Sequence, residues 1–298
     1  EIDQAFWDLV TIDGQIYGIP MVSNTMHVFY NEPKMAELGL EVPTTFEEAI
    51  ALCEPLEAAG EKGFVLMYQA PWAWQIEFDN VIGSLGETAI DPETGQPNFT
   101  SDAAVEAANV LKDVYDNCAD TDAPEFGTTE IAGGFQSGQY IVGQTWASRA
   151  IEMDDENVSS EAGNIQFAPA LSTGGPALAA PAYIDGYAIP SDTDGDVDAI
   201  FLAIMAAADT ESQEAAAEFN TVTRNGVSNP DGPRNTEAVA TSYTDGRGAD
   251  LTHPAAGLAR TVLGDALQKI ATEGADPATV LADAEEQYLS EAQDQGLL

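Results

Sequence analysis

Hydrophobic and polar positions near the start of the chain form two short apolar runs around a polar break. Residues 15–20 predict a strand that a proline ends, because proline offers no backbone N–H to a sheet. Residues 26–30 are rich in β-branched and aromatic side chains, which predicts a second strand. Between the two runs lie Ser23, Asn24 and Thr25. The pattern predicts two strands joined by a polar crossing.

Helical patterns follow this crossing. Thr45 and Glu48 have the spacing of a capping box, which predicts the start of a helix. Apolar residues recur every three or four positions through Cys53 in this helix and through Cys118 in a later one. Further strands are predicted at residues 64–67, 139–144, 165–168 and 183–190. Strands that alternate with helices in this way predict an α/β fold.

The composition adds an extreme charge to this picture. The 298 residues include 51 Asp and Glu but nine Lys and Arg, a net charge of −42, and 44% of the chain is hydrophobic. This length allows a substantial core in one large or two modest domains. The charge repels nucleic acid and anionic membrane surfaces. We interpret it as adaptation to high salt, where self-repulsion is screened, in preference to a surface for cations or a basic partner.

The motifs of several function classes are missing from the sequence. The longest apolar run, residues 199–208, is shorter than the roughly 20 residues that a membrane-spanning helix needs. There is no nucleophile elbow, phosphate-binding loop or zinc-protease motif, and two histidines offer little for a catalytic triad. Asp192, Asp194 and Asp196 begin like a calcium loop but lack its glycine and glutamate, so we interpret them as a helix-capping turn. We therefore expect no metal, no cofactor and no enzymatic activity.

Cys53 and Cys118 are the two cysteines of the chain. Both lie on apolar helix stripes, which suits two buried thiols. An oxidising exported compartment would equally permit a disulfide between them. Both alternatives stay open at the level of the sequence.

The order of motifs resembles the extracellular solute-binding proteins of ABC importers, in particular those that bind sugars. The matching motifs are the Asp-Gly-x-x-Tyr-Gly-x-Pro strand at residues 13–20, the polar hinge, the Tyr30-Asn31 strand end and the Pro-Thr-x-x-Glu helix start after residue 42, with a further match at residues 135–146. The resemblance implies a two-lobed, periplasmic-binding-protein-like type II fold with a hinge between the lobes.

Mapped on this family, the first lobe holds residues 1–24 and 184–234, and the second holds residues 25–183 and 235–298. In the family the hinge segment follows much of the first lobe, whereas here it begins at Asp13. We therefore expect the first lobe to be incomplete, with its N-terminal part missing. The start of the chain carries no signal peptide, and an export signal would belong to that missing part.

Tryptophans are the leading candidates for ligand contact, because sugars stack their apolar C–H faces on aromatic rings. Trp72 and Trp74 are predicted in a loop, and Trp146 after a strand, where α/β sheets meet their ligands. Core packing is the alternative for any one of them. The resemblance extends the predicted ligand site to Asn24, Tyr183, Asp185 and Gly186, with Ser23, Thr25, Gln75, Arg149, Tyr187 and His253 as secondary contacts. For Asn24 the alternative is hydrogen bonding of the linker backbone, and for Arg149 it is neutralisation of nearby carboxylates.

The resemblance implies a monomeric periplasmic or cell-surface receptor that closes around a sugar, oligosaccharide or polyol. Such a receptor delivers its ligand to ABC permease subunits, and it inserts into no membrane and binds no nucleic acid. Two alternatives remain, a secreted carbohydrate hydrolase and a sensory ligand-binding module on the same fold.

Overall fold

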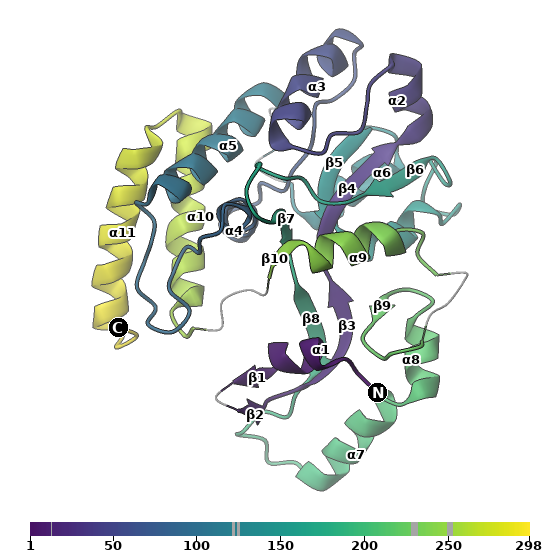
Figure 1. The fold of residues 1–298 in the computed structure, drawn as a ribbon, viewed down its shortest axis with the longest axis vertical. Helices are drawn as coiled ribbons and strands as arrows, with labels where there is room; N and C mark the ends of the chain where they lie inside the picture. The colour runs from purple at the N-terminus through teal and green to yellow at the C-terminus, as the bar shows by residue number, and fades with distance from the viewer. Residues whose placement is uncertain (13, 121–122, 124–125, 228–231, 249–252) are drawn as a thin grey trace.

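The computed structural model describes residues 1–12, 14–120, 123, 126–227, 232–248 and 253–298. Asp13, where the predicted hinge segment starts, lies outside these residues. Figure 1 shows two groups of elements, and strands β3 (Ile19–Asn24) and β8 (Tyr183–Tyr187) run side by side toward the junction between them. We call the group that contains β3 and β8 the first lobe and the other group the second lobe.

The first lobe is built on a three-stranded sheet of order β8-β3-β9. Its other elements are α1 (Gln4–Leu9), the hairpin β1 (Thr11–Ile12) and β2 (Gln15–Ile16), α7 (Val197–Ala207), α8 (Thr210–Ala216) and β9 (Thr221–Val222). The chain begins in this lobe (Figure 1).

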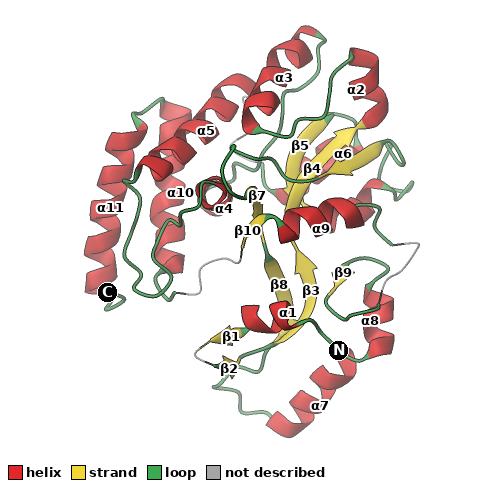
Figure 2. Ribbon diagram, viewed as in Figure 1, coloured by secondary structure: helices red, strands yellow, loops and turns green. Residues whose placement is uncertain are grey.

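The second lobe surrounds a three-stranded antiparallel sheet of order β5-β4-β6 and a parallel pair, β10-β7. Helices cover these sheets (Figure 2). The strands are β4 (Met26–Asn31), β5 (Val142–Trp146), β6 (Ile165–Ala168), β7 (Leu178–Pro181) and β10 (Gly246–Gly248). The helices are α2 (Glu32–Leu38), α3 (Phe46–Ala58), α4 (Trp72–Ser84), α5 (Asp102–Cys118), α6 (Thr128–Gln136), the 3₁₀ helix η2 (Ala147–Met153), α9 (Thr236–Thr244), α10 (Ala256–Glu273) and α11 (Pro277–Asp294). The predicted α/β class is confirmed.

The hydrophobic core belongs to the second lobe. Its connected cluster of buried side chains runs from Met26 to Ala179 and from Ala255 to Ala292. The first lobe contributes isolated buried residues such as Met21 and Ala208, and α7 contains no buried residue. The two lobes therefore differ sharply in how much apolar surface they bury.

Helix starts follow the sequence closely. The Thr45 hydroxyl accepts the Glu48 N–H at 3.1 Å, which confirms the predicted cap of α3. The Glu48 carboxylate accepts the Thr44 N–H at 2.8 Å, one residue before the position that a capping box requires. The Asp196 carboxylate accepts the Asp198 and Ala199 N–H groups at the start of α7, which confirms the capping interpretation of this acidic turn.

Several strand boundaries differ from those that the sequence predicts. The predicted proline end is wrong, because Pro20 lies inside β3, where the pairing with β8 shifts between Pro20 and Val22. Such an irregularity tolerates a residue without an N–H donor. Ser23 and Asn24 belong to β3, so the break is Thr25 alone. The predicted strand at residues 64–67 is reduced to an isolated bridge from Val65.

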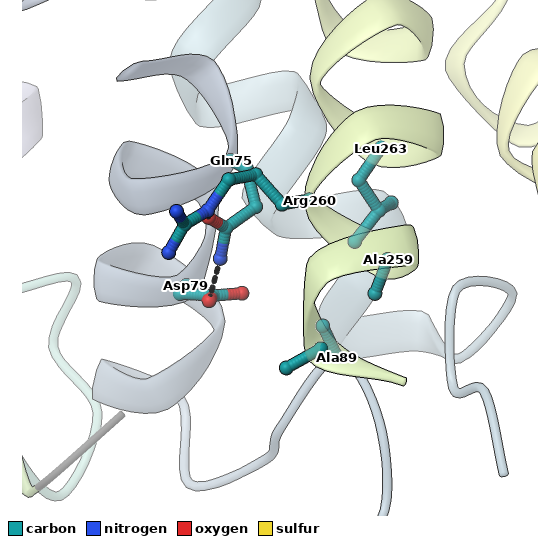
Figure 3. Close-up of a pocket in the computed structure, with 7 residues that line it drawn as sticks. Gln75, Asp79, Ala89, Ala259, Arg260 and Leu263 are labelled. Atoms are coloured by element: carbon teal, nitrogen blue, oxygen red, sulfur yellow. Dashed lines mark hydrogen bonds between the residues drawn. The ribbon is translucent and has the colours of Figure 1, made fainter. Parts of the chain in front are cut away.

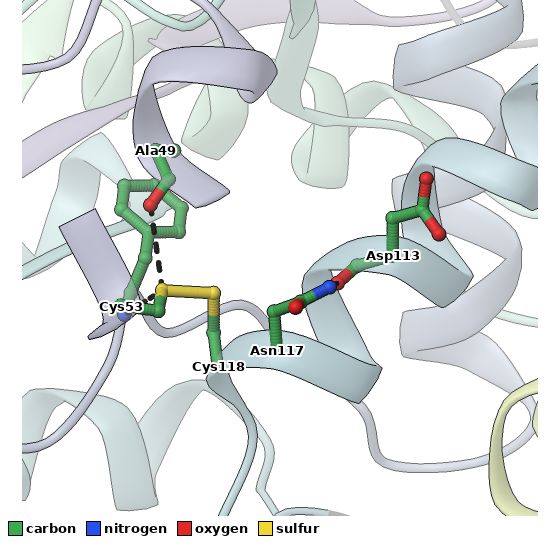
Figure 4. The surroundings of a disulfide bond; sticks show 6 residues. Ala49, Cys53, Asp113, Asn117 and Cys118 are labelled. Atoms are coloured by element: carbon green, nitrogen blue, oxygen red, sulfur yellow. Dashed lines mark hydrogen bonds between the residues drawn. A yellow bond between two sulfur atoms is a disulfide. The ribbon is translucent and has the colours of Figure 1, made fainter. Parts of the chain in front are cut away.

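Cys53 and Cys118 form a disulfide bond, with their sulfur atoms 2.06 Å apart (Figure 4). The bond joins α3 to the last residue of α5 and links positions 65 residues apart in sequence. The alternative of two free buried thiols is excluded.

Candidate functional site

Two of the three connections between the lobes, from β3 to β4 and from β7 to β8, meet at one place. Strands β3 and β8 are antiparallel partners, and Asn24 at the end of β3 lies opposite Tyr183 at the start of β8. On the second-lobe side, Met26 in β4 lies opposite Trp146 at the end of β5. This pairing brings together three predicted ligand residues that lie far apart in sequence. We call Asn24, Trp146, Ser148 and Tyr183 the crossing site.

Trp146 and Tyr183 form an aromatic pair at the crossing site. Their ring centroids are 5.2 Å apart and their planes are inclined by 74°, an edge-to-face arrangement. Both side chains are partly exposed. Partly exposed aromatic rings offer apolar surface to a ligand while they support each other.

Asn24 joins the end of β3 to the second lobe through side-chain hydrogen bonds. Its side-chain nitrogen donates to the Ser148 hydroxyl at 3.3 Å, and its oxygen accepts the backbone N–H groups of Thr25 and Ser148 at 3.1 and 3.2 Å. These contacts match the alternative in which Asn24 supports the linker backbone. Ser23 and Thr25 are buried, and the Ser23 hydroxyl donates to the Thr221 carbonyl at 3.2 Å.

A buried histidine supports the second-lobe side of the crossing, and the sequence offered no pattern that would single it out. The Nδ1 of His27 donates to the Val28 carbonyl at 3.2 Å, and its Nε2 accepts the Asn235 side-chain N–H at 2.8 Å. Asn235 also donates to the Ala147 carbonyl at 2.9 Å. Burial lowers the pKa of His27 to about 4, so the ring is neutral at pH 7.

The predicted loop around Trp72 and Trp74 is wrong, because both residues lie in the first turn of α4. Trp74 is 1% exposed and packs against Tyr68 and Tyr115 with centroid distances of 4.9 and 5.8 Å. This is the core-packing alternative. Trp72 is partly exposed, and its indole N–H donates to the Gln69 side-chain oxygen at 2.9 Å.

Helix α4 carries polar residues inside the protein, and cations from two other segments reach them. Gln75 donates to the Asp79 carboxylate and accepts from Arg260 Nε at 3.2 Å (Figure 3). Arg247 Nε donates to the Asn80 side-chain oxygen at 2.9 Å. We call these five residues the α4 cluster. Of these five residues, Gln75 alone is a contact predicted from the sequence, although the polar residues within an otherwise apolar helix are a visible signal.

The α4 cluster borders two small hollows that share Asp79. One lies between α4 and α10, and the other lies beside Arg247 and Gly83, each with a volume of about 30 Å³. A water needs roughly 10–15 Å³ of such space, so each hollow has room for about two waters and is too small for a sugar. Asn80 also donates to the Met26 sulfur at 3.1 Å, which connects the cluster to the strand opposite Trp146.

Glu77, on the same helix, is fully buried. Burial raises the pKa of Glu77 to about 8, although hydrogen bonds from the Met67 N–H and the Asn80 side chain and the nearby Arg247 charge act in the opposite direction. The carboxyl group is therefore mostly neutral at pH 7. Burial likewise lowers the pKa of Arg247, while Asp79 and Glu77 partly offset that effect.

The remaining predicted residues of β8 lie farther from the crossing site, within the first lobe. Asp185, Gly186 and Tyr187 are exposed and pair with the part of β3 before the crossing. A Cβ on Gly186 would lie 2.5 Å from the Ile19 carbonyl oxygen, so the close approach of the two strands requires glycine. Strand packing thus explains this glycine without a ligand.

The other secondary candidates have protein partners. The Arg149 guanidinium donates to the Glu152 carboxylate at 2.6 Å, in agreement with the alternative that it neutralises a local charge. The His253 ring occupies the space beside Gly95 and accepts the Ala255 N–H at 3.1 Å. His253 thus lies just before α10 and packs against the turn at Gly95.

Within the part of the chain that the structure describes, no helix is both long and apolar enough to cross a bilayer. Among the same residues, no three His, Cys, Asp or Glu side chains gather in a way that could hold a metal ion.

Comparison with known proteins identifies relatives of this chain. Residues 1–219 match the family model described as bacterial extracellular solute-binding protein. The multiple sugar-binding protein of Streptococcus mutans is 27% identical over 173 residues, which are 55% of this chain and 40% of the relative. The chain thus matches less than half the length of this curated relative.

Solved structures share the fold at low sequence identity. A solute-binding protein of an ABC transporter from Agrobacterium vitis, with bound D-mannitol, has a TM-score of 0.82 and 19% identity, and the match covers 99% of this chain and 77% of that one. A solute-binding protein from Agrobacterium radiobacter in complex with ribitol has a TM-score of 0.81 and 20% identity, with 96% and 75% covered. These similarities confirm the predicted two-lobed fold.

Proposed function

The chain belongs to the bacterial extracellular solute-binding protein family, and from this premise we propose that it is the substrate-binding receptor of an ABC importer. Its ligand is a sugar, an oligosaccharide or a polyol. The names of the relatives support this ligand class, since the streptococcal protein is a multiple sugar-binding protein and the two Agrobacterium proteins hold D-mannitol and ribitol.

One observation carries the proposal. Both strands that run to the junction between the lobes lie side by side, and the aromatic pair Trp146–Tyr183 sits where they meet. A ligand at this place contacts both lobes at once. A ligand that binds the closed arrangement more tightly than the open one shifts the population toward closure.

The side chains near the proposed ligand have different chemical roles. Trp146, Tyr183 and Trp72 offer ring surface to the C–H faces of the ligand. The α4 cluster borders hollows that are too small for a sugar, and its Gln75–Arg260 hydrogen bond joins α4 to α10, so we assign the cluster a supporting role. Asn24 supports the hinge through its bonds to Ser148.

The proposal extends to the setting of the receptor. The closed receptor delivers its ligand to permease subunits in the membrane and acts as a monomer in the periplasm or at the cell surface. The net charge of −42 fits a saline habitat, because high salt screens the repulsion among carboxylates. No bond chemistry is part of this function.

Tryptophan fluorescence tests the proposal directly. The protein, in about 1 M salt so that its charges are screened, is titrated with D-mannitol, ribitol, maltose and D-glucose. We expect at least one saturable fluorescence change, which Trp146→Ala abolishes. Trp7→Phe, in α1, serves as the matched control and retains the response.

Two results would contradict the proposal. One is the absence of a saturable response to every member of a broad sugar and polyol panel, checked by calorimetry. The other is sustained release of reducing sugar from an oligosaccharide at catalytic amounts of protein, which would indicate the hydrolase.

A further inference from the structure

A third connection joins the lobes, from β9 of the first lobe to α9 of the second. It passes beside the crossing site, because Asn24, Ser148 and Asn235 line one hollow of about 10 Å³. In the first lobe the connection is attached to β3, since β9 pairs with this strand and the Thr223 hydroxyl donates to the Pro20 carbonyl at 2.7 Å. The way its other end is held therefore limits how the lobes can move relative to each other.

Arg234 attaches the third connection to the second lobe just before α9. Its guanidinium binds both carboxylate oxygens of Asp154, with Nε 2.7 Å from Oδ2 and Nη2 2.7 Å from Oδ1. Nη1 donates to the Gln166 side-chain oxygen at 2.9 Å, and Nη2 also donates to the Ile165 carbonyl at 2.7 Å. Four of the five N–H groups of this arginine are thus bound to the second lobe.

Two aromatic rings of the second lobe extend this attachment. The Arg234 guanidinium lies 5.5 Å from the centroid of the Phe167 ring, within the range of a cation–π contact. Phe167 meets the ring of His27 edge to face, with centroids 5.4 Å apart. His27 Nε2 accepts the Asn235 side-chain N–H at 2.8 Å. Two consecutive residues of the connection therefore contact one pair of packed rings.

Charge neutralisation alone does not explain the contacts of Arg234. The chain has nine Lys and Arg for 51 Asp and Glu, so a cation can meet a carboxylate at many places. A planar guanidinium that binds both oxygens of one carboxylate requires a defined geometry, which the ammonium group of lysine cannot reproduce. The contacts of Arg234 therefore fix the position of the third connection on the second lobe.

We propose that Arg234 is a positioning residue, which holds the third connection on the second lobe and thereby restricts the orientations that the lobes sample around the crossing site. Confinement to fewer orientations leaves a larger fraction of free molecules in the arrangement that binds ligand. The apparent dissociation constant equals the intrinsic one divided by that fraction, so Arg234 strengthens binding without touching the ligand. The effect on affinity rests on the proposed function, whereas the effect on lobe orientation does not.

Single-molecule energy transfer measures the lobe orientations of the free protein. Dyes on Val158→Cys in the second lobe and on Leu202→Cys in α7 report on the two lobes, because both positions are exposed and the native cysteines are bonded to each other. We expect Arg234→Gln to broaden the distribution of transfer efficiencies in the absence of ligand. Arg234→Lys should broaden it as well, because an ammonium group keeps the charge but loses the planar fork.

Lys34→Gln is the matched control. The Lys34–Glu61 ion pair lies within the second lobe, and its side chains are 35% and 26% exposed, close to the 37% and 29% of the Arg234–Asp154 pair. This variant should keep the wild-type distribution. Asp154→Asn removes the same paired contact from the other side, so it should broaden the distribution by itself and add nothing when combined with Arg234→Gln.

Ligand titration provides the second measurement, with D-mannitol, ribitol, maltose or D-glucose, whichever the wild type binds. We expect Arg234→Gln to raise the dissociation constant by about fivefold or more, a usual strength for coupling between distant groups. The fluorescence change at saturation should equal that of the wild type, because the ring of Trp146 is unaltered. If the wild type binds none of these compounds, the proposed function is contradicted, and energy transfer in the free proteins still tests Arg234.

Three results would overturn the inference. The first is a wild-type distribution of transfer efficiencies in folded Arg234→Gln and Asp154→Asn variants. The second is equal broadening in Lys34→Gln, which would show that the loss of any ion pair has this effect. The third is an unchanged dissociation constant in an Arg234→Gln variant whose distribution is broadened.

Discussion

Helices α7 and α11 show how differently the two lobes use apolar residues. Helix α11 places Leu281 and Tyr288 in the core with no exposed surface, and its other face is polar. Helix α7 is more apolar, yet none of its residues is buried. Apolar content therefore does not identify a core helix by itself, because burial also requires a partner surface.

The same contrast separates the lobes as a whole. The second lobe has a connected core, a disulfide and helices on its sheets, whereas the first lobe has a three-stranded sheet with an open edge. Since burial of apolar surface is the main favourable term in folding, we expect the second lobe to hold most of the stability of the chain. Four measurements test that expectation.

The largest effect is expected in the core of the second lobe. Leu281→Ala leaves a cavity in a site with no exposure, and such changes cost about 3–5 kcal/mol in free energy of unfolding. Urea denaturation followed by circular dichroism measures this loss. A cost below that of an ordinary surface substitution would contradict the assignment of the core to this lobe.

The disulfide is expected to have the next largest effect. The double substitution Cys53→Ala and Cys118→Ala removes a link across 65 residues and lowers the free energy of unfolding by about 2–4 kcal/mol. Denaturation of the oxidised protein and of the variant provides the comparison. A reduced wild-type sample, with both thiols alkylated after unfolding and counted by mass, should match the variant.

Glu77 introduces a pH dependence into the second lobe. The pKa of Glu77 is about 8 in the folded protein and near 4.5 when exposed. The contribution of the neutral carboxyl group to the free energy of unfolding is therefore fully present below pH 4.5 and is lost as pH rises through about 8. One proton of difference gives a slope of up to about 1.4 kcal/mol per pH unit in that window.

Glu77→Gln removes this titration while it keeps the shape of the side chain. We expect the stability difference between the variant and the wild type to shift in favour of the variant from pH 5 to pH 8, in about 1 M salt where the other carboxylates are screened. Identical pH profiles of the two proteins would show that Glu77 is ionised in the fold.

The smallest effect is expected in the first lobe. Leu202→Ala makes the same chemical change as Leu281→Ala, but at a residue that is 68% exposed, so its effect on residues 1–298 should stay within about 0.5 kcal/mol. The two leucine variants measured side by side give the most direct comparison of the lobes. Equal costs at both positions would remove the distinction.

Local signals made the crossing predictable from the sequence. Its polar break, its β-branched runs and the helix cap at Thr45 each depend on a few neighbouring residues. The resemblance then related Asn24, Trp146 and Tyr183, which strand pairing does bring together. The pairing itself was beyond local reasoning, because it joins residues more than a hundred positions apart.

The α4 cluster had a weaker local signal. Asp79 and Asn80 interrupt an apolar helix in the sequence, but their partners Arg247 and Arg260 come from distant segments that local reasoning does not identify. The prediction of a loop at Trp74 is wrong for a related reason. Trp74 lies in the first turn of α4, and the helix directs its ring into the core. Tertiary contacts decide both cases.

The paired strands β3 and β8 have a mechanical consequence for the molecule. Hydrogen bonds between them make this part of the connection a ribbon two strands wide, so the lobes cannot slide apart along it without breaking several bonds at once. We therefore expect the lobes to move by rotation at the residues where both strands end, Asn24 and Tyr183, because hinges commonly lie at the ends of elements. Fluorescent labels on α7 and α11 should then report a change of orientation larger than their change of separation.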